Sequence, residues 1–268
     1  MAKLGGIIQV YNEANYFPYA LKQAEQMCDE IMIFEGCHSC QRNPRSTDGT
    51  VDMVVESGHS YTLVGANPGT RYDAMQMNVL WGGVREMIAR GCDWFRIWDC
   101  DMFFFDADAQ MIKEMLDRTD KDCIMFNERR FIFNWRINTH DITGYFYRVT
   151  DGMYMSPISR VHNSSGEIVR DNPNLVEQMG ICCHHFTQAK KLDRAKFRFQ
   201  ISKEKGTPGI DELWEKYVDF EIPWKISGYE KDIEEMVGGF GANAEPGPHP
   251  EILDGHPYRF VSDIRKAK

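Results

Sequence analysis

The sequence lacks any apolar stretch long enough to span a membrane, and its first residues lack the long apolar core of a signal peptide. It also lacks an excess of positive charge, because 31 Lys and Arg stand against 40 Asp and Glu for a net charge of -9. A protein whose main task is to hold nucleic acid needs a basic surface. We therefore expect no membrane span and a cytoplasmic location, and nucleic acid is disfavoured as a partner.

Repeats and paired cysteines are also scarce. No internal repeat is visible, and the eight cysteines are scattered, several of them in apolar runs, which is typical of free thiols in a reducing compartment. The Cys-x-x-Cys segment from Cys37 to Cys40 has no second copy. A structural zinc site that joins this segment to Cys182, Cys183 or a histidine is therefore the less favoured alternative.

The sequence does contain a regular alternation of apolar runs and amphipathic segments. Its 268 residues, 43% of them apolar, suit one large α/β domain. A strand at 5–11, a helix at 14–27 and a strand at 30–34 open the chain, and such a unit implies a parallel pair. Further strands are expected at 61–64, 94–98 and 123–126, helices at 51–56, 71–90, 109–118 and 190–203, an apolar run at 180–186, and a less regular stretch at 127–166. Thr47 or Asp48 is the expected N-cap of the helix at 51–56.

The stretch from Asp93 to Asp106 carries the strongest chemical signal. An apolar run, Trp94 to Trp98, ends in Asp99-Cys100-Asp101. Carboxylates at the tip of a buried strand are costly unless something neutralises them, and Mg²⁺ or Mn²⁺ takes carboxylate oxygens and shares itself with phosphates. The competing interpretation, which we weigh equally on this stretch alone, is that Asp101 caps a turn and Asp99 pairs with an Arg.

Several motifs in order resemble those of one family. They are Val10-Tyr11-Asn12-Glu13 after the first strand, the second strand up to Glu35, Ser46-Thr47-Asp48-Gly49-Thr50 before the second helix, the Asp-x-Asp triplet at 99–101, and a late histidine followed by a basic helix. Over about residues 5 to 200 the chain resembles a GT-A-fold, family-2-like glycosyltransferase. The resemblance implies an α/β fold with a Rossmann-like, mixed and mostly parallel sheet flanked by helices. It places this domain at 1–203, with a donor half at about 1–106 and an acceptor half at about 107–203, and leaves 204–268 as an extension packed on it.

The resemblance also implies a nucleotide-sugar donor, with a UDP-sugar favoured, over the carboxyl-terminal edge of the sheet. Tyr11, Glu13 and Glu35 would line the base and ribose pocket. Arg71 and Asn78 stand where family members often place polar groups that contact the donor. Each of these assignments is an expectation carried over from the family.

The same resemblance assigns the metal and the diphosphate. Asp99 would face the ribose or the metal, and Asp101 would ligate a Mn²⁺ or Mg²⁺ ion. Of His184 and His185, neighbours on an extended segment that point to opposite faces, only one should reach the ion. We favour His185 because its context, followed by Phe and Thr, is nearer to the family's, while a structural histidine is the alternative. In the basic helix we favour Lys196 as a diphosphate contact.

Two departures from the family concern Glu35, where the family commonly has Asp, and the catalytic base. Residues 37–45 form an insertion after Glu35, and the acidic motif that supplies the family's base is not recognisable. Transfer with inversion needs a base for the acceptor hydroxyl, and we rank Glu128 and Asp141 first. Behind these two candidates stand Asp151 and Glu167, and the candidates for holding acceptor or sugar are Arg129, Arg130, Arg148 and His162.

We therefore expect a metal-dependent glycosyltransferase of the hexosyltransferase type that acts on a hydroxyl acceptor. The first alternative is a nucleotidyltransferase of similar α/β build. That class would carry a Gly-rich loop with Lys or Arg after the first strand, which Asn12-Glu13-Ala14 does not provide. The second alternative is a non-catalytic module that binds a nucleotide or sugar.

Overall fold

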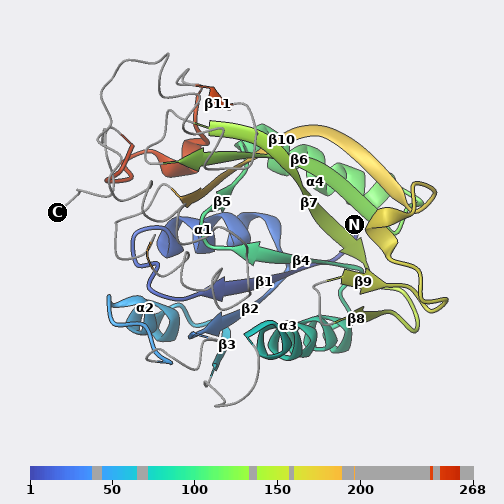
Figure 1. The fold of residues 1–268 in the computed structure, drawn as a ribbon, viewed down its shortest axis with the longest axis horizontal. Helices are drawn as coiled ribbons and strands as arrows, with labels where there is room; N and C mark the ends of the chain where they lie inside the picture. The colour runs from blue at the N-terminus through green and yellow to red at the C-terminus, as the bar shows by residue number, and fades with distance from the viewer. Residues whose placement is uncertain are drawn as a thin grey trace.

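The computed structural model describes residues 1–37, 44–64, 72–132, 138–156, 160–188, 196, 242–243 and 248–259, with the backbone alone at 72–78, 130, 132, 138–143, 187–188 and 242–243. Within these ranges nine strands form one mixed sheet with the order β3-β2-β1-β4-β7-β6-β10-β5, and β11 pairs with β7 (Figure 1). The Cys-x-x-Cys residues His38 to Cys40 lie outside them.

The first half of the sheet is parallel. Strand β1 (Leu4–Val10) pairs with β2 (Glu30–Glu35) and with β4 (Trp94–Asp99), and β2 pairs with β3 (Ser60–Leu63). All four strands were predicted within a residue or two. Their carboxyl ends therefore meet at one edge of the sheet, as in other open α/β sheets.

The second half mixes directions. Strand β6 (Cys123–Ile132) runs parallel to β10 (Val176–Gln188) and antiparallel to β7 (Asn138–Arg148), which joins β4. The short β5 (Met102–Phe103) pairs with β10, β11 (Ala242–Asn243) extends β7, and β8 (Tyr154–Ser156) and β9 (Arg160–His162) form a separate hairpin. The predicted class, a mixed and mostly parallel sheet flanked by helices, is confirmed. The stretch at 127–166, where the sequence pattern is less regular, contains the end of β6 together with β7, β8 and β9, which the pattern did not predict.

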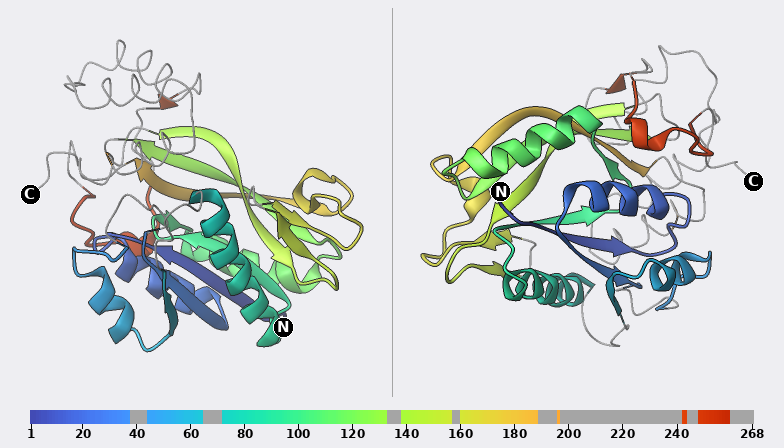
Figure 2. Two further views of the ribbon diagram at one scale, coloured as in Figure 1. Left: turned by 60° about the horizontal axis from the view of Figure 1, so that its bottom comes forward. Right: turned by 180° about the vertical axis from the view of Figure 1, so that it is seen from behind.

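Helices cover both faces of the sheet. On one face lie α1 (Phe17–Met27) and α4 (Asp106–Arg118), and on the other lies α3 (Tyr72–Ala89) (Figure 2). Helix α1 has Pro18 in its first turn, where a missing N–H costs nothing, and buries the stripe Phe17, Ala20, Ala24 and Met27. None of the described helices is both long and apolar enough to cross a membrane.

The short helix α2 (Thr50–Glu56) corrects one prediction. Its N-cap is Gly49, at φ 91°, rather than Thr47 or Asp48. The Asp48 carboxylate still serves this end of the helix, because it accepts hydrogen bonds from the Thr50 N–H at 3.2 Å and from the Thr50 hydroxyl at 2.6 Å.

A C-terminal segment, residues 248–259 with the 3₁₀ turn η2 (Glu251–Leu253), packs beside α1. Leu253 and Tyr258 join the core on that face, and the Asn15 side-chain amide donates to the Tyr258 hydroxyl at 2.7 Å. A second 3₁₀ turn, η1 (Val169–Asp171), precedes β10. Most of 204–268 lies outside the described residues, so the domain boundary at 203/204 stays a prediction.

Candidate metal and nucleotide site

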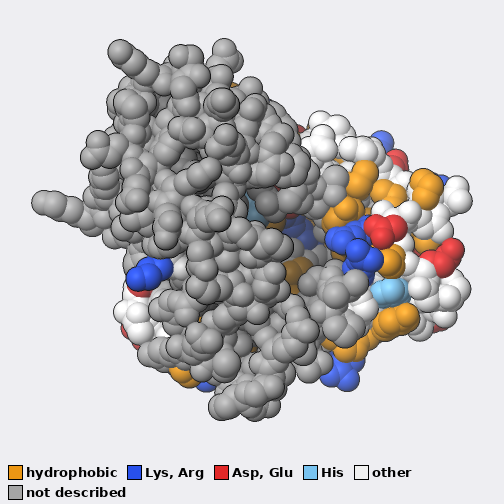
Figure 3. All heavy atoms as spheres, in the orientation of Figure 1, with side chains coloured by type: hydrophobic (Ala, Val, Ile, Leu, Met, Phe, Trp, Pro, Cys, Tyr) orange, Lys and Arg blue, Asp and Glu red, His pale blue; other side chains and the backbone are white. Residues whose placement is uncertain are grey.

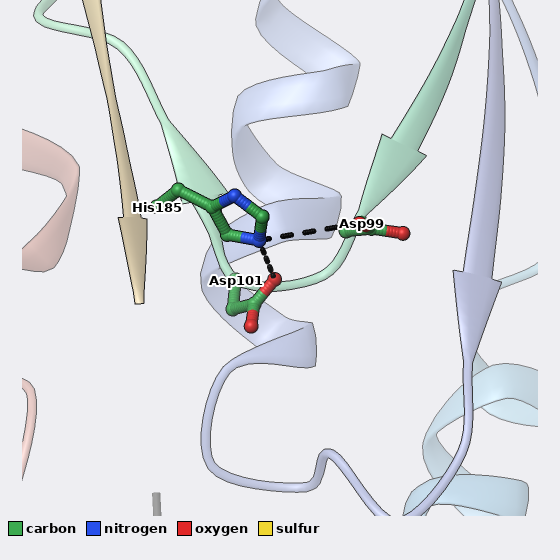
Figure 4. Close-up of side chains that lie close together, drawn as sticks. All are labelled: Asp99, Asp101 and His185. Atoms are coloured by element: carbon green, nitrogen blue, oxygen red, sulfur yellow. Dashed lines mark ion pairs between the residues drawn. The ribbon is translucent and has the colours of Figure 1, made fainter. Parts of the chain in front are cut away.

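Asp99, Asp101 and His185 converge at the carboxyl-terminal edge of the sheet. Asp99 is the last residue of β4, and a tight turn at Cys100 and Asp101 leads into β5. Strand β5 pairs with β10 so that His185 stands opposite Met102. Figure 4 shows the result: Nε2 of His185 lies 3.3 Å from Asp101 Oδ1 and 4.0 Å from Asp99 Oδ2.

These three side chains fit a hard divalent cation. One ligand atom from each lies within 4.8 Å of the others. His185 Nε2 is buried and makes no well-aligned hydrogen bond to the described residues, so that this nitrogen is suited to a ligand. The two carboxylates suit Mn²⁺ or Mg²⁺, and the imidazole is a nitrogen ligand that Mn²⁺ accepts more readily than Mg²⁺, which prefers oxygen.

The electrostatics of the cluster are those of a site that holds positive charge. Burial by itself lowers the pKa of His185, but the carboxylates of Asp101 and Glu128 outweigh it and raise the pKa to about 9. Without a cation, the imidazolium therefore offsets the negative charge of Asp101 at neutral pH. A metal ion held by Nε2 would take the place of its proton, so metal binding would release a proton.

Backbone and thiol contacts hold the Asp-x-Asp turn in place. The Phe186 N–H donates to the Asp101 carbonyl at 2.8 Å, which ties the turn to β10. The Cys100 thiol donates to the Gln9 carbonyl at 3.0 Å, which ties it to β1. The Asp101 side chain is 4% exposed and that of Asp99 41%, so Asp99 is the more open to a ligand in solution.

Arg96, inside the strand that leads to the turn, is not the partner of Asp99. Its side chain is 1% exposed and its guanidinium lies 4.5 Å from the Trp98 ring and 4.6 Å from the Phe104 ring. It donates to Met102 Sδ at 3.3 Å. Planar stacking lets a guanidinium lie among aromatic rings, where an ammonium would be costly. Arg96 is therefore not the arginine partner that the alternative interpretation requires for Asp99.

Glu128 lies behind the imidazole. Its Oε2 is 3.1 Å from His185 Nδ1, and both side chains are buried, at 4% and 2% exposed. The parallel register of β6 with β10, in which Glu128 stands beside Cys183, produces this contact. A general base for a bound acceptor needs access to the ligand, and this burial does not favour that role for Glu128.

His184 points away from the three-residue cluster. Its ring packs against Phe105 and Phe131, each at 5.1 Å between ring centroids, and against His249 at 5.6 Å. The expectation that adjacent histidines face opposite ways is what the structure shows. His185 is the one that lies with Asp99 and Asp101.

Asp141, the other candidate base, stands at an irregular point of β7. The register with β6 jumps from Glu128 opposite Ile142 to Arg129 opposite His140, so Asp141 is an extra residue in the ladder. Bulges of this kind redirect side chains beside active sites. The Asp141 side chain is not among those described, and its role stays a prediction.

The donor-side residues lie at the same edge, at the ends of β1 and β2. Glu13 and Glu35 are buried, at 7% and 0% exposed, and Tyr11 is half-buried. Glu35 Oε1 accepts a hydrogen bond from the Ser46 N–H at 2.9 Å, and the Glu13 N–H donates to Thr50 Oγ1 at 3.0 Å. The Ser46 to Thr50 motif thus fastens both carboxyl-terminal ends together.

Asn12 completes this connection. Its positive φ of 51° is one that Asn tolerates better than most residues. Its N–H donates to Ser46 Oγ at 2.8 Å, its Oδ1 accepts from the Thr47 N–H at 2.7 Å, and the next N–H, of Ala14, donates to Asp48 Oδ2 at 3.0 Å. The polar insertion after β2 therefore does not separate Glu35 from the motif.

The remaining predicted residues lie as follows. Arg71 is outside the described residues, Asn78 is on α3 with its side chain not described, and Lys196 is exposed. The side chain of Arg148 donates to backbone carbonyls at 119 and 121 and stacks on Trp94, at the start of β4 and away from the cluster. Glu167 and His162 each make a contact within the turn that follows β9. The Glu167 carboxylate accepts a hydrogen bond from the Asn163 side-chain amide, and a ring nitrogen of His162 contacts the Gly166 carbonyl.

Two residues that support the site were not anticipated. Gln23 is 1% exposed on α1, and its side-chain amide bonds both the N–H and the carbonyl of Phe104, at 2.9 and 2.8 Å. In the sequence, a polar Gln within the apolar stripe of α1 is the feature that indicates a buried hydrogen-bonding role. Gly144 is the other: a Cβ there would meet the Phe126 ring at 2.1 Å and Glu128 Oε1 at 2.9 Å.

On the described part of the face drawn in Figure 3, basic side chains lie next to acidic and apolar ones.

Comparison with solved structures finds GT-A glycosyltransferases at low identity. TarS 1–349 from S. aureus in complex with UDP matches with a TM-score of 0.47 and 12% identity, over 88% of this chain and 70% of that one. Glucosyl-3-phosphoglycerate synthase from Mycobacterium tuberculosis, in complex with Mn²⁺, UDP and its product, matches with a TM-score of 0.42 and 12% identity, over 77% and 81%. A CMP:2-keto-3-deoxy-manno-octonic acid synthetase complexed with CTP matches with a TM-score of 0.37 and 11% identity, over 68% and 90%.

No protein family's sequence profile matches the chain, and no curated protein matches it by sequence. The three structural matches have sequence identities of 11 to 12%. Because their TM-scores are below 0.5, the function proposed below depends on the motifs and on the geometry of the site.

Proposed function

We propose that this protein is a metal-dependent glycosyltransferase that moves a sugar from a nucleoside diphosphate sugar, in the first place a UDP-sugar, to a hydroxyl acceptor. The observation that carries the proposal is the convergence of Asp99, Asp101 and His185 at one edge of the sheet. The Asp-x-Asp turn and the late histidine are far apart in sequence, and both belong to the motif set of the family that the chain resembles.

The cluster would hold Mn²⁺ or Mg²⁺, and the ion would neutralise the diphosphate as it leaves the sugar. Asp101 and His185 are buried and fixed by their surroundings, so they provide a preorganised binding position. Asp99, more exposed, is placed to face either the ion or the ribose.

On the donor side, Tyr11, Glu13 and Glu35 would line the base and ribose pocket. Their common edge with the cluster supports this assignment, because β1 lies between β2 and β4. Arg71, Asn78 and Lys196 remain proposed donor contacts, carried over from the family pattern alone.

On the acceptor side, Asp141 is the proposed base that takes the proton from the acceptor hydroxyl as the new bond forms. Inversion at the anomeric carbon, a cytoplasmic location and a division into a donor half at 1–106 and an acceptor half at 107–203 complete the proposal. The resemblance in the motifs supports inversion and the two halves, and the scattered cysteines, typical of a reducing compartment, support the location.

The test is a thermal-shift panel of nucleoside diphosphates with Mn²⁺ and with EDTA, followed by a screen for donor hydrolysis. Ligand binding raises the melting temperature by mass action. We expect a Mn²⁺-dependent shift with one diphosphate, lost in Asp101→Asn and kept in Asp120→Asn, a matched change at a carboxylate that is 90% exposed.

A metal-dependent shift without release of diphosphate from any nucleotide sugar, even with acceptors supplied, would favour the non-catalytic module. Release of pyrophosphate from a nucleoside triphosphate in the presence of a sugar or sugar phosphate would favour the nucleotidyltransferase. No shift with any diphosphate would overturn the proposed site.

A further inference from the structure

Glu128 contacts His185 and lies behind the three candidate metal ligands, Asp99, Asp101 and His185. The imidazole ring stands between two sets of carboxylates: Nε2 faces Asp101 and Asp99, while Nδ1 lies 3.1 Å from Glu128 Oε2. Glu128 is therefore on the side of the ring away from the candidate ligands, and it is not one of the three residues that come together.

The chemistry of imidazole decides what such a carboxylate can do. A neutral imidazole has one N–H and one lone pair, and only the lone pair binds a metal. A carboxylate accepts hydrogen bonds but donates none. Facing Glu128, Nδ1 must therefore carry the proton, which leaves the lone pair on Nε2, on the side of Asp99 and Asp101.

A glycine in strand β7 leaves the space that the Glu128 carboxylate needs. Gly144 lies on β7 opposite Phe126, and a Cβ at this position would meet the Phe126 ring at 2.1 Å and Glu128 Oε1 at 2.9 Å. A glycine within a strand is unfavourable by itself. Its absence of a side chain leaves the space in which the Glu128 carboxylate and the Phe126 ring lie.

We propose that Glu128 is a positioning residue that holds His185 in the tautomer and orientation needed for metal binding, and is not the catalytic base. This inference rests on the proposed function, because it concerns the same metal site. Partners of this kind typically contribute about 10- to 100-fold to metal affinity.

The experiment measures Mn²⁺ affinity of the full chain by electron paramagnetic resonance, without any donor or acceptor. Glu128→Met keeps the volume of the side chain and removes the acceptor, and it should weaken Mn²⁺ binding by about 10- to 100-fold. Glu128→Gln, whose amide oxygen still accepts from Nδ1, should lose less. Glu177→Gln, a charge removal near the start of the same strand as His185, should bind Mn²⁺ like the wild type.

A double-mutant cycle with His185→Ala separates positioning from simple charge. If Glu128 acts through the imidazole, Glu128→Met in the His185→Ala background should change Mn²⁺ affinity by less than about 2-fold. An equal loss in both backgrounds would mean that Glu128 acts by its charge alone, and would overturn the inference.

Nitrogen NMR of the protein loaded with Zn²⁺, a diamagnetic probe, shows directly which ring nitrogen of His185 carries the proton. It tests the inference even if His185→Ala binds no Mn²⁺ and the double-mutant cycle cannot be measured. A proton on Nδ1 of His185 supports the inference, and a proton on Nε2 overturns it. If the wild type binds Mn²⁺ and Glu128→Met binds it equally well, the inference fails alone. If the wild type binds no Mn²⁺, the proposed function fails as well.

Discussion

His256 should make the stability of the protein depend on pH below neutrality. Its side chain is 3% exposed, with ring centroids 4.6 Å from Tyr16 and 4.8 Å from Tyr19, so it secures the C-terminal segment on α1. Burial lowers the pKa of His256 from 6.5 to about 4, although a backbone contact with Asn15 acts in the opposite direction. The neutral ring is the form that fits this apolar position.

The sign and size of the effect follow from proton linkage. Because the folded-state pKa is below the unfolded value, unfolding takes up a proton between these two pKa values, and stability falls as the pH falls from 6.5 towards 4. Above pH 6.5 His256 has no such effect. At pH 5 the loss amounts to about 2 kcal/mol of the free energy of unfolding.

Urea denaturation at pH 7.5 and pH 5 measures this loss. Carboxylates also titrate in that range, so the useful quantity is the difference between the wild type and His256→Phe. The wild type should lose about 2 kcal/mol more than the variant on acidification. His59→Gln, which removes a partly exposed histidine that pairs with Glu25, should follow the wild type. Equal losses in the wild type and His256→Phe would refute the reasoning.

Three further predictions concern packing. In α3, Gly82→Ala places its Cβ in open space and should stabilise the fold by about 1 kcal/mol. At the next position, the Cβ of Gly83→Ala meets side chains of β2 and β1 at 2.7 and 3.1 Å, so this substitution should destabilise the fold by about 1 to 3 kcal/mol. Chemical denaturation of the two variants measures the opposite changes in the free energy of unfolding. Arg96→Lys should destabilise more than Arg96→Met, because an ammonium among the aromatic rings keeps a buried charge without planar stacking, and the reverse order of melting temperatures would contradict this account. Gly144→Ala should weaken Mn²⁺ binding by displacing Glu128, while Gly82→Ala should leave Mn²⁺ affinity unchanged.

Much of the parallel half of the sheet could be predicted from local pattern. The runs before Asn12, Glu35 and Asp99 are strongly apolar and end in polar residues, and parallel strands bring such ends to one edge. This rule predicted Asp99 and Asp101 at that edge as candidate metal ligands. The resemblance to the glycosyltransferase family indicated His185, and the alternation of side chains implied only that one of His184 and His185 would reach the ion. The strands and the Asp-x-Asp turn were predicted from neighbours in sequence and one general property of α/β sheets, whereas the histidine was predicted from the family pattern.

The second half could not be predicted in the same way. Strand β7 begins with polar residues, and pairing with β4 and β6 stabilises it through contacts that no local window contains. The contact of Glu128 with His185 depends on the register of β6 against β10, which is not legible in either segment alone. For this reason Glu128 was expected to be a base on the rim, whereas the structure buries it behind the histidine.

The most direct test of the central claim is anomalous diffraction at the manganese edge from crystals grown with MnCl₂ and UDP. We predict one anomalous peak within bonding distance of the Asp99 and Asp101 carboxylates and of His185 Nε2, with the diphosphate beside it. A peak elsewhere, or none at this edge of the sheet while UDP is bound, would contradict the account.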